Sequence, residues 1–290
     1  SFPTSTGFSS VTNNNGEFRN QGIEIELSGK IIDSKDWTWS ASGNIAFNKN
    51  KIVSLPDNGM ERNRINAFQV YTGNGDEKKW VGGQQEGQEP GILYLYQADG
   101  IYRSYDEIPA NLVRKYGSRT YYGPEAWNKL TAEQQNATTN FPIQPGDTKF
   151  HDVNGDDVID EFDKVKVGAT SPRWTGGFNT TLRWKNFQLY GRFDYALGFW
   201  LYENSGTQST TPWFMGCYQG TYNTPTMYYD TWSESNPNAK YPRYLFADQN
   251  GKNNYIASTM FAYRGDYLAI REISLSYSLP ESVAKMLKMQ

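Results

Sequence analysis

The chain has 290 residues and a formal net charge of −3, so it carries no basic surface that would indicate a nucleic-acid partner. Its mean hydropathy of −0.73 and the lack of any run of about 18 apolar residues exclude membrane-spanning helices. These values do not exclude a transmembrane β-barrel, in which only alternate strand residues face lipid.

Aromatic residues make up 16% of the chain. Such an excess fits aromatic girdles at membrane interfaces, and a Tyr-rich soluble sandwich would show it equally. The single cysteine, Cys217, allows no internal disulfide, and the single histidine, His151, provides no multi-histidine metal site. Because no Walker loop, GxSxG or HExxH motif occurs either, we expect the protein not to be an enzyme.

The first two predicted strands form a hairpin. Residues 17–32 alternate Ile23, Ile25 and Leu27 with Glu24 and Glu26, residues 33–36 form a short turn, and a second alternating run follows from residue 37. A period of two indicates a strand with one apolar and one polar side. Runs of a dozen residues suit a tilted bilayer crossing of about 9–11 residues with an extension into solvent.

The polar connection that follows is expected to contain little regular structure. Residues 50–90 are rich in glycine, and the weaker alternation at 64–72 and 91–97 allows further strands. Residues 104–146 are predicted to be a loop with local helix at 106–116 and 124–136. Within the second of these, Thr131 and Gln134 have the spacing of a capping box.

Segment 152–163 has the spacing of a calcium-binding loop. Val158 offers a backbone carbonyl at position 7, which together with the side chains could wrap Ca²⁺ or Mg²⁺ in hard oxygens, as in EF-hands and dockerins. Asp157 stands where the sharp turn prefers glycine. The alternative is an acidic turn held by Asx hydrogen bonds. The side-chain oxygens at positions 1, 3, 5, 9 and 12 come from Asp152, Asn154, Asp156, Asp160 and Asp163.

The clearest hairpin lies at residues 173–198, with its turn at Lys185-Asn186. Its polar side includes Arg183, Arg192 and Asp194. An arginine facing lipid near the midplane costs about 2–4 kcal/mol, so we expect these charges to face a water-filled lumen.

Residues 200–262 are predicted to form a long aromatic loop. Flat rings suit sugar faces and peptide side chains, and the alternative is that they pack the loop on itself or on a partner. The candidates for ligand or lid contact are Trp213, Phe214, Tyr218, Tyr222, Tyr228, Tyr229 and Trp232.

The last predicted strand covers residues 265–279 and ends before Pro280. Strict alternation would place mixed residues on both sides. One side would hold Ala269, Arg271, Ile273, Leu275 and Tyr277, and the other Leu268, Ile270, Glu272, Ser274 and Ser276.

Five such strands cannot close a barrel, which needs at least eight. The chain opens on Ser1-Phe2-Pro3 without a signal peptide and closes without a terminal strand. We therefore expect a fragment of a longer exported protein, whose wall is completed by further sequence or by other copies.

Together these stretches resemble SusC/RagA-like TonB-dependent outer-membrane transporters over nearly the whole chain. Their order and spacing are similar to those in the C-terminal half of such a barrel. The most specific stretches are residues 98–102, 146–163, 185–189, 230–232, 236–243 and 267–273. The resemblance implies an all-β fold, an antiparallel transmembrane β-barrel of 22 strands in the parent protein with an N-terminal plug. It also implies extracellular loops at 98–170 and 200–262, a SusD-like lipoprotein lid, and TonB acting through the plug.

The first functional hypothesis is active import of oligosaccharides or peptides across the bacterial outer membrane. The second is a soluble, Tyr-rich β-protein that binds or hydrolyses glycans. Its carboxylate pair would be Glu24 and Glu26, about 7 Å apart on one strand face, and the alternative is that they line a wet lumen. A third, weaker hypothesis is a structural surface-layer or adhesin module.

Solubility and side-chain placement discriminate among these hypotheses. A barrel wall exposes Trp39, Ile45, Phe178 and Phe193 on one side of a lone sheet, whereas a sandwich buries them between two sheets.

Overall fold

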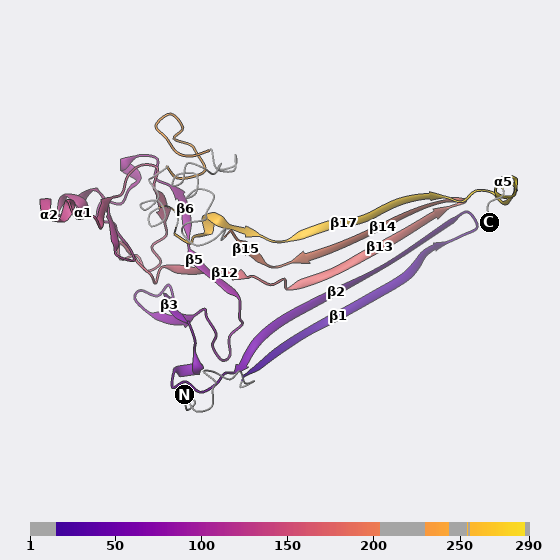
Figure 1. The fold of residues 1–290 in the computed structure, drawn as a ribbon, viewed down its shortest axis with the longest axis horizontal. Coiled ribbons are helices and arrows are strands. Elements are labelled where there is room, and N and C mark those ends of the chain that lie inside the picture. The colour runs from indigo at the N-terminus through magenta and orange to yellow at the C-terminus, as the bar shows by residue number, and fades with distance from the viewer. Residues whose placement is uncertain (1–15, 204–229, 244–253, 255, 288–290) are drawn as a thin grey trace, which may run out of the picture.

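The computed structural model describes residues 16–203, 230–243, 254 and 256–287. One antiparallel sheet, in the order β1-β2-β13-β14-β17, dominates the fold. Figure 1 shows it as a long ribbon of strands running from the loops at one end to the C-terminal side at the other. The five predicted strands are thereby confirmed. Their bounds are β1 (Glu17–Asp33), β2 (Trp37–Ser54), β13 (Trp174–Trp184), β14 (Phe187–Leu197) and β17 (Tyr267–Tyr277).

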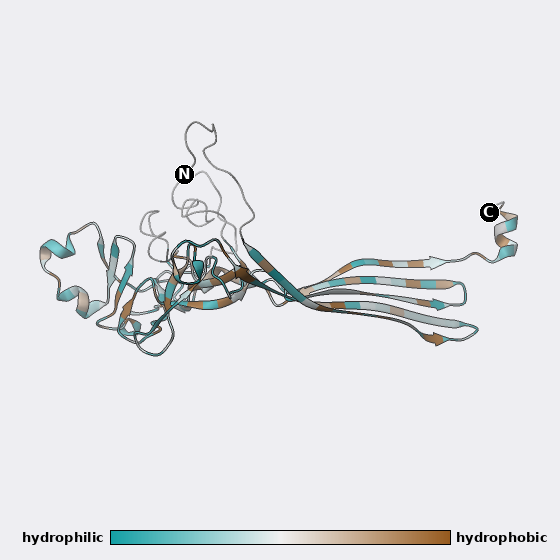
Figure 2. Cartoon of the chain, turned by 90° about the horizontal axis from the view of Figure 1, so that it is seen from below, coloured by the Kyte–Doolittle hydropathy of each residue, from teal (hydrophilic) through white to brown (hydrophobic). Residues whose placement is uncertain are grey.

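The sheet has one apolar and one polar face, and within the described residues no second sheet is stacked on either. The register places Leu27, Gly43, Phe178 and Phe193 in one row, next to a polar row that contains Asn44. The side chains of the apolar row are open to the surroundings, with Leu27 73% and Phe178 41% exposed. Figure 2 shows apolar and polar residues alternating along the strands. The sandwich interpretation, which required these side chains to be buried, is wrong.

Aromatic side chains flank the apolar face at both ends. Beside the short turns, Trp37, Trp184, Phe187 and Tyr277 form a continuous row with successive ring centroids 5.7, 5.9 and 4.6 Å apart. At the other end, Phe47 and Trp174 are 4.7 Å apart. Strand β13 rises about 33 Å from Trp174 to Trp184, which at a tilt of about 40° spans about 25 Å of membrane. This height matches the apolar band of a transmembrane barrel wall.

A β-bulge in β17 overturns the strict alternation predicted for that strand. Arg192 pairs with Glu272 and Phe193 pairs with Ile270, so Arg271 is the extra residue. The bulge shifts the later part of the strand by one position. As a result Leu268, Ile270, Ile273, Leu275 and Tyr277 all lie on the apolar face, and Ala269, Glu272, Ser274 and Ser276 lie on the polar face.

The long connections gather at the end of the sheet opposite the short turns (Figure 1). Among the described residues, no helix has the length and apolar character needed to cross a bilayer. The further strands are β3 (Phe68–Tyr71), β4 (Lys78–Val81), β5 (Ile92–Tyr96), β6 (Ala98–Ile101), β7 (Val113–Tyr116), β8 (Arg119–Tyr122), β9 (Asn140–Pro142), β10 (Thr148–Phe150), β11 (Val158–Ile159), β12 (Lys164–Ala169), β15 (Trp200–Tyr202) and β16 (Ala262–Arg264). The described helices are α1 (Pro124–Asn128), α2 (Ala132–Gln135) and α5 (Glu281–Met286), with 3-10 turns at Glu61–Asn63, Tyr105–Glu107 and Thr259–Phe261.

The helix predicted at 106–116 is wrong. Only the turn at Tyr105–Glu107 is helical, and β7 then pairs with β8 around Gly117, whose φ of +58° suits a tight reversal. The expected helical character at 124–136 is confirmed as α1 and α2, and Thr131 with Gln134 forms the predicted capping box. The loop region has its own core, made by Tyr96, Tyr102, Ile108, Leu112, Tyr121, Ile143, Phe150, Ile159 and Ile256.

Candidate functional site

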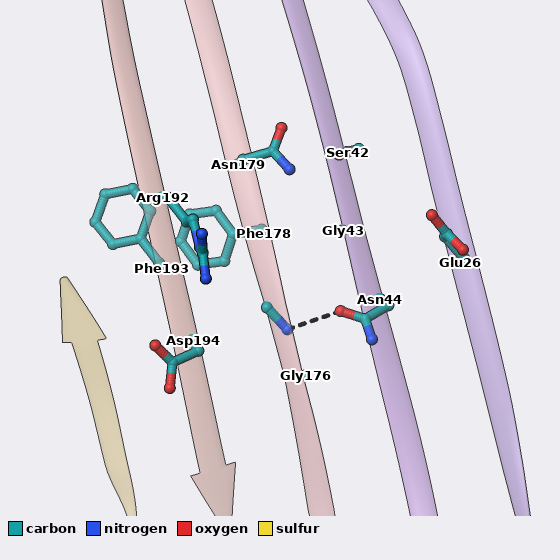
Figure 3. Close-up of a pocket in the computed structure, with 11 residues that line it drawn as sticks. Glu26, Ser42, Gly43, Asn44, Gly176, Phe178, Asn179, Arg192, Phe193 and Asp194 are labelled. Atoms are coloured by element: carbon teal, nitrogen blue, oxygen red, sulfur yellow. Dashed lines mark hydrogen bonds between the residues drawn. The ribbon is translucent and has the colours of Figure 1, made fainter. Parts of the chain in front are cut away.

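The polar face of the sheet contains a hollow of about 400 Å³ (Figure 3). Two neighbouring polar rows provide most of its lining, together with Gly43, Gly176, Phe178 and Phe193 from the apolar rows beside them. One row runs through Glu26, Asn44, Gly177 and Asp194, and the next through Ser28, Ser42, Asn179 and Arg192. Alternation along β-strands directs both rows to the same side, away from the apolar face. Arg192 and Asp194 therefore lie on the polar face, and the prediction that this face lines a lumen stays a prediction.

Glycine and asparagine shape the floor of the hollow. The Gly177 N–H donates to Asn44 Oδ1 at 2.9 Å, which fixes the orientation of that side-chain amide (Figure 3). A Cβ on Gly177 would lie 2.8 Å from the Phe193 carbonyl oxygen, closer than real Cβ atoms approach. The missing side chain therefore both permits the close strand pairing and leaves space between Asn44 and Asp194.

The two charged residues of β14 in the hollow differ in their partners. Asp194 accepts hydrogen bonds from Arg271 Nε and, at 2.8 Å, from Arg271 Nη2, so its charge is neutralised by a two-pronged ion pair. Arg192 lies directly opposite Glu272 in the register, yet within the described residues its side chain has no ion-pair partner. The Glu26 carboxylate on β1 is likewise without a charged partner in that part of the chain.

The glutamate pair proposed for glycan hydrolysis lies on the polar face of the edge strand. Glu24 pairs in register with Ala46 and Glu26 with Asn44, and both glutamates are exposed. A general acid requires a raised pKa, which an apolar pocket around one carboxyl would provide. Glu26 instead borders the polar hollow. The arrangement matches the alternative interpretation, a pair lining a wet surface.

The acidic segment 152–163 folds as a compact turn. Asp157 has a φ of +61°, the left-handed conformation expected at the glycine position of a calcium loop. Asp152 accepts the N–H groups of Gly155 and Asp157, both at 2.8 Å. Asp163 accepts those of Val153 at 2.9 Å and of Asp160 at 2.7 Å.

These carboxylates hold the turn by Asx-type hydrogen bonds. Asp156 and Asp160 each accept a further backbone N–H, from Val158 at 2.8 Å and from Phe162 at 2.9 Å. In the described part of the chain, no three His, Cys, Asp or Glu side chains converge as metal ligands. The arrangement does not by itself form a metal centre, and ion binding by Asp152, Asn154, Asp156, Val158, Asp160 and Asp163 stays a prediction.

Asp163 is the electrostatically unusual member of this segment. Its side chain is completely buried. Burial raises its pKa from 3.8 to about 6, although the two backbone hydrogen bonds from Asp160 and Val153 oppose the shift, and the nearby charges of Asp160 and Asp152 add to it.

Most of the predicted aromatic contact residues lie outside the described residues. These are Trp213, Phe214, Tyr218, Tyr222, Tyr228 and Tyr229. Trp232 is described and partly buried, and its ring packs where a Cβ on Gly146 would lie, at only 2.4 Å. Its backbone N–H donates to the Tyr241 carbonyl at 2.8 Å. These contacts favour the alternative interpretation for Trp232, in which the ring packs the loops together.

The sequence did not predict several buried polar residues whose contacts hold the loop segments together. Asp147 is fully buried and accepts from Arg243 Nε at 2.7 Å, from Asn254 Nδ2 at 3.3 Å and from the Gln144 N–H at 3.0 Å. Buried Arg114 has its guanidinium carbon 4.4 Å from the Tyr121 ring centroid. Burial lowers the Arg114 pKa. Because Arg243 and Asn254 lie 96 and 107 residues from Asp147 in the sequence, no local pattern could have indicated the network.

Known proteins are similar in sequence to this chain over nearly its whole length, although no family model matches it. The chain is 28% identical over 280 residues to TonB-dependent receptor P3 of Formosa agariphila, covering 97% of this chain and 24% of that receptor. It is 23% identical over 281 residues to the TonB-dependent receptor SusC of Bacteroides thetaiotaomicron, covering 95% of this chain and 22% of SusC.

Solved structures of the RagAB peptide transporter have the same fold over this segment. One matches with a TM-score of 0.54 and 20% identity, and the open-open state of the RagAB peptide importer matches with a TM-score of 0.53 and 20% identity. They cover 97% and 98% of this chain, and each match covers 25% of the solved chain. The chain thus spans about a quarter of the length of the proteins it matches. In sequence and fold the chain is therefore similar to SusC/RagA-like TonB-dependent transporters, over a stretch of about a quarter of their length.

Proposed function

We propose that this segment forms part of the wall of an outer-membrane importer for oligosaccharides or peptides. The observation that carries the proposal is the two-faced, single-layered sheet, whose apolar face lies between aromatic rows about 25 Å apart. In such a wall the apolar face contacts lipid and the polar face lines a wet passage. No bond is made or broken, so the work of the protein is gating.

The long connections support an orientation for this wall. Short turns lie on the periplasmic side of outer-membrane barrels and long loops lie outside. Loops 98–170 and 200–262 would then face the exterior, where a SusD-like surface lipoprotein covers them. TonB would act from the periplasm, through a plug. Substrate must bind the lidded and open states with different affinity in order to shift their populations.

The placement of the wall is tested by cysteine labelling of the full-length transporter in outer membranes. In a background in which the native Cys217 is replaced by serine, we expect a membrane-impermeant maleimide to label a cysteine introduced at Asn179, on the polar face, and not one introduced at Phe178, on the apolar face. Both variants must first show folded, heat-modifiable barrels. Equal labelling of the two positions, or a protein that stays monodisperse without detergent, would overturn the proposal.

Import itself is tested by uptake into cells that express the full-length protein. Radiolabelled trialanine and maltotriose represent the two substrate classes. We expect uptake of at least one of them to stop when TonB is deleted or when a protonophore collapses the proton-motive force. Uptake that continues under both treatments would exclude energised transport.

A further inference from the structure

We propose that three cations on the lipid side of the β1–β2 hairpin bind the phosphate groups of the glycolipid that forms the outer leaflet of the outer membrane. The cations are Arg19, Lys49 and Lys51, and all three are exposed. The inference rests on the proposed wall placement, because only a wall with its long loops outside brings this end of the sheet to that leaflet. The cations lie on the side of the wall that faces away from the passage, so neither a plug nor a substrate competes for them.

The register of the hairpin places these cations on the same side as the apolar residues. Pairing of the two strands is regular over this stretch, with Ile23 opposite Phe47 on the apolar face and Arg19 opposite Lys51 further out. Side chains two positions apart along a strand point to the same face. Lys49 and Lys51 therefore continue the apolar side beyond Phe47.

The cations begin where the apolar band ends. Phe47 and Trp174, with ring centroids 4.7 Å apart, mark the loop-side edge of that band, and β1 and β2 continue past them toward the loops (Figure 1). Successive rows on one face are about 6.7 Å apart along a strand, so at a tilt of about 40° each row adds about 5 Å of height. Lys49 is then about 5 Å beyond the aromatic pair and Lys51 about 10 Å beyond it. Since a headgroup zone of about 5–7 Å borders the hydrocarbon, the cations lie at the level of lipid phosphates and sugars.

The cluster carries more positive charge than its own residues neutralise. Arg19 has one acidic neighbour, Glu17, with 3.6 Å between Arg19 Nη2 and Glu17 Oε1. Lys49 and Lys51 have no ion-pair partner among the described residues. Arg19 and Lys51 are directly opposite in the register, and like charges in that position destabilise an antiparallel pair. A bound phosphate would replace this repulsion with charge-assisted hydrogen bonds.

The other side of this part of the hairpin is already covered. Ile52, which follows Lys51 and points to the opposite face, is only 6% exposed. Its N–H donates to the Gln88 carbonyl at 2.9 Å, and its carbonyl accepts the Gly87 N–H at 2.8 Å. Contacts with the loops thus hold the outer end of β2, and within the described chain its cationic side remains exposed.

The continuity of the two surfaces indicates that the anion belongs to a lipid. Acyl chains can lie against the exposed side chains of Ile23 and Ile45, and the phosphates of the same molecule then reach the cations above them. Basic residues next to a membrane surface each contribute to binding anionic headgroups in this way. A soluble phosphate would use the cations but leave the adjoining apolar surface without a role.

The experiment uses the full-length transporter in dodecyl maltoside and measures bound lipid by native mass spectrometry. The probes are diphosphoryl lipid A, fully dephosphorylated lipid A and dioleoyl phosphatidylglycerol. We expect Lys49→Gln and Lys51→Gln each to weaken binding of diphosphoryl lipid A about fivefold and to leave binding of the dephosphorylated form unchanged. Glu17→Gln should strengthen binding of diphosphoryl lipid A, because it frees Arg19 from its acidic neighbour. A gain of affinity cannot come from misfolding.

Matched controls separate the site from a general charge effect. Lys35→Gln removes a lysine at the short turn, in the opposite leaflet, and should leave lipid A affinity unchanged. The double variant Lys49→Gln/Asn48→Lys keeps the net charge but moves it to the other face of β2. It should bind lipid A as weakly as Lys49→Gln alone. Every variant must first show a folded, heat-modifiable barrel.

Four results would overturn the inference. They are no binding of lipid A to the unaltered transporter, equal binding of its dephosphorylated form, phosphatidylglycerol binding as tightly as diphosphoryl lipid A, or recovery of affinity when Asn48→Lys is added. The uptake and labelling experiments are independent of these titrations. Energised uptake with failed titrations would remove the glycolipid site alone, whereas loss of membrane placement would remove the importer itself.

Discussion

Arg271 and Asp194 form a two-pronged ion pair at the bulge where β17 departs from regular pairing with β14. The bulge brings Arg271 to the polar side beside Asp194 and also moves the rest of β17 by one position. If Arg271 is deleted, the remaining residues of β17 alternate strictly between the two faces. Ile270 and Ile273 stay on the apolar face, and Glu272 stays on the polar face. We therefore expect the Arg271 deletion to fold as a heat-modifiable barrel, measured by gel mobility before and after boiling.

Deletion of Ser274 is the matched control. It either turns Leu275 to the polar side or, if the bulge is lost instead, turns Glu272 toward lipid. Folded, heat-modifiable material should be strongly reduced for this variant. Equal folding of the two deletions would contradict the assigned register.

The sequence predicted those parts of the fold that depend on period-two alternation. The hairpin of β13 and β14 appears at Trp174–Trp184 and Phe187–Leu197, almost as expected for 173–198. Alternation is decisive there because each face meets one uniform environment. It failed at β17 because a single inserted residue, Arg271, reverses the pattern without leaving any local sign of where pairing shifts.

The loop region was less predictable because its contacts are distant in the sequence. The polar segment 106–116 was predicted to be helical, but Val113 and Arg114 pair with Val158 and Ile159 of β11. For the site, the polar placement of Arg192 and Asp194 followed from the cost of burying charge in lipid. The neutralisation of Asp194 by Arg271 did not, since it depends on the bulge.

Gly176 allows a close approach on the apolar face. Tyr195 lies over it and donates its hydroxyl to the Asn44 carbonyl at 3.2 Å. A Cβ on Gly176 would lie 2.1 Å from that carbonyl oxygen and 2.6 Å from the Tyr195 hydroxyl. We expect Gly176→Ala to lower the free energy of unfolding by about 1–3 kcal/mol in urea titrations in lipid vesicles. Gly29→Ala, where nothing lies within 4 Å, should be close to neutral, and comparable losses would refute the steric reason.

The two faces should respond differently to charge. Phe178 lies near the middle of β13 between Trp174 and Trp184, which places it close to the membrane midplane. Phe178→Arg should cost about 2–4 kcal/mol of unfolding free energy, because the guanidinium would face hydrocarbon. Asn179→Arg, one position along on the polar face, should cost far less. Vesicle unfolding of both variants measures the contrast, and similar costs would mean that neither face contacts lipid.

Asp163 should make the loop region less stable as the pH rises. Its pKa is raised to about 6 in the folded protein from 3.8, so the folded state holds the proton more tightly than the unfolded state. The stabilisation is full below about pH 4 and is lost as pH rises through about 6, by no more than about 3 kcal/mol.

Asp163→Asn removes this titration and serves as the reference. We expect the melting temperature of the unaltered protein, minus that of the variant, to fall between pH 4 and pH 6. A difference that stays constant over this range would show that the buried carboxyl titrates normally.

Calcium distinguishes the two interpretations of segment 152–163. A bound ion would raise the melting temperature saturably, and Asp163→Asn would abolish the rise. The hydrogen-bonded turn requires no ion, because the side chains of Asp152 and Asp163 each already accept two backbone N–H groups. A melting temperature that stays unchanged in millimolar Ca²⁺ and after its removal by a chelator would favour the hydrogen-bonded turn. A saturable increase in melting temperature that depends on Asp163 would instead establish the ion site. The bound ion would then offset the negative charge of the buried Asp163 carboxylate.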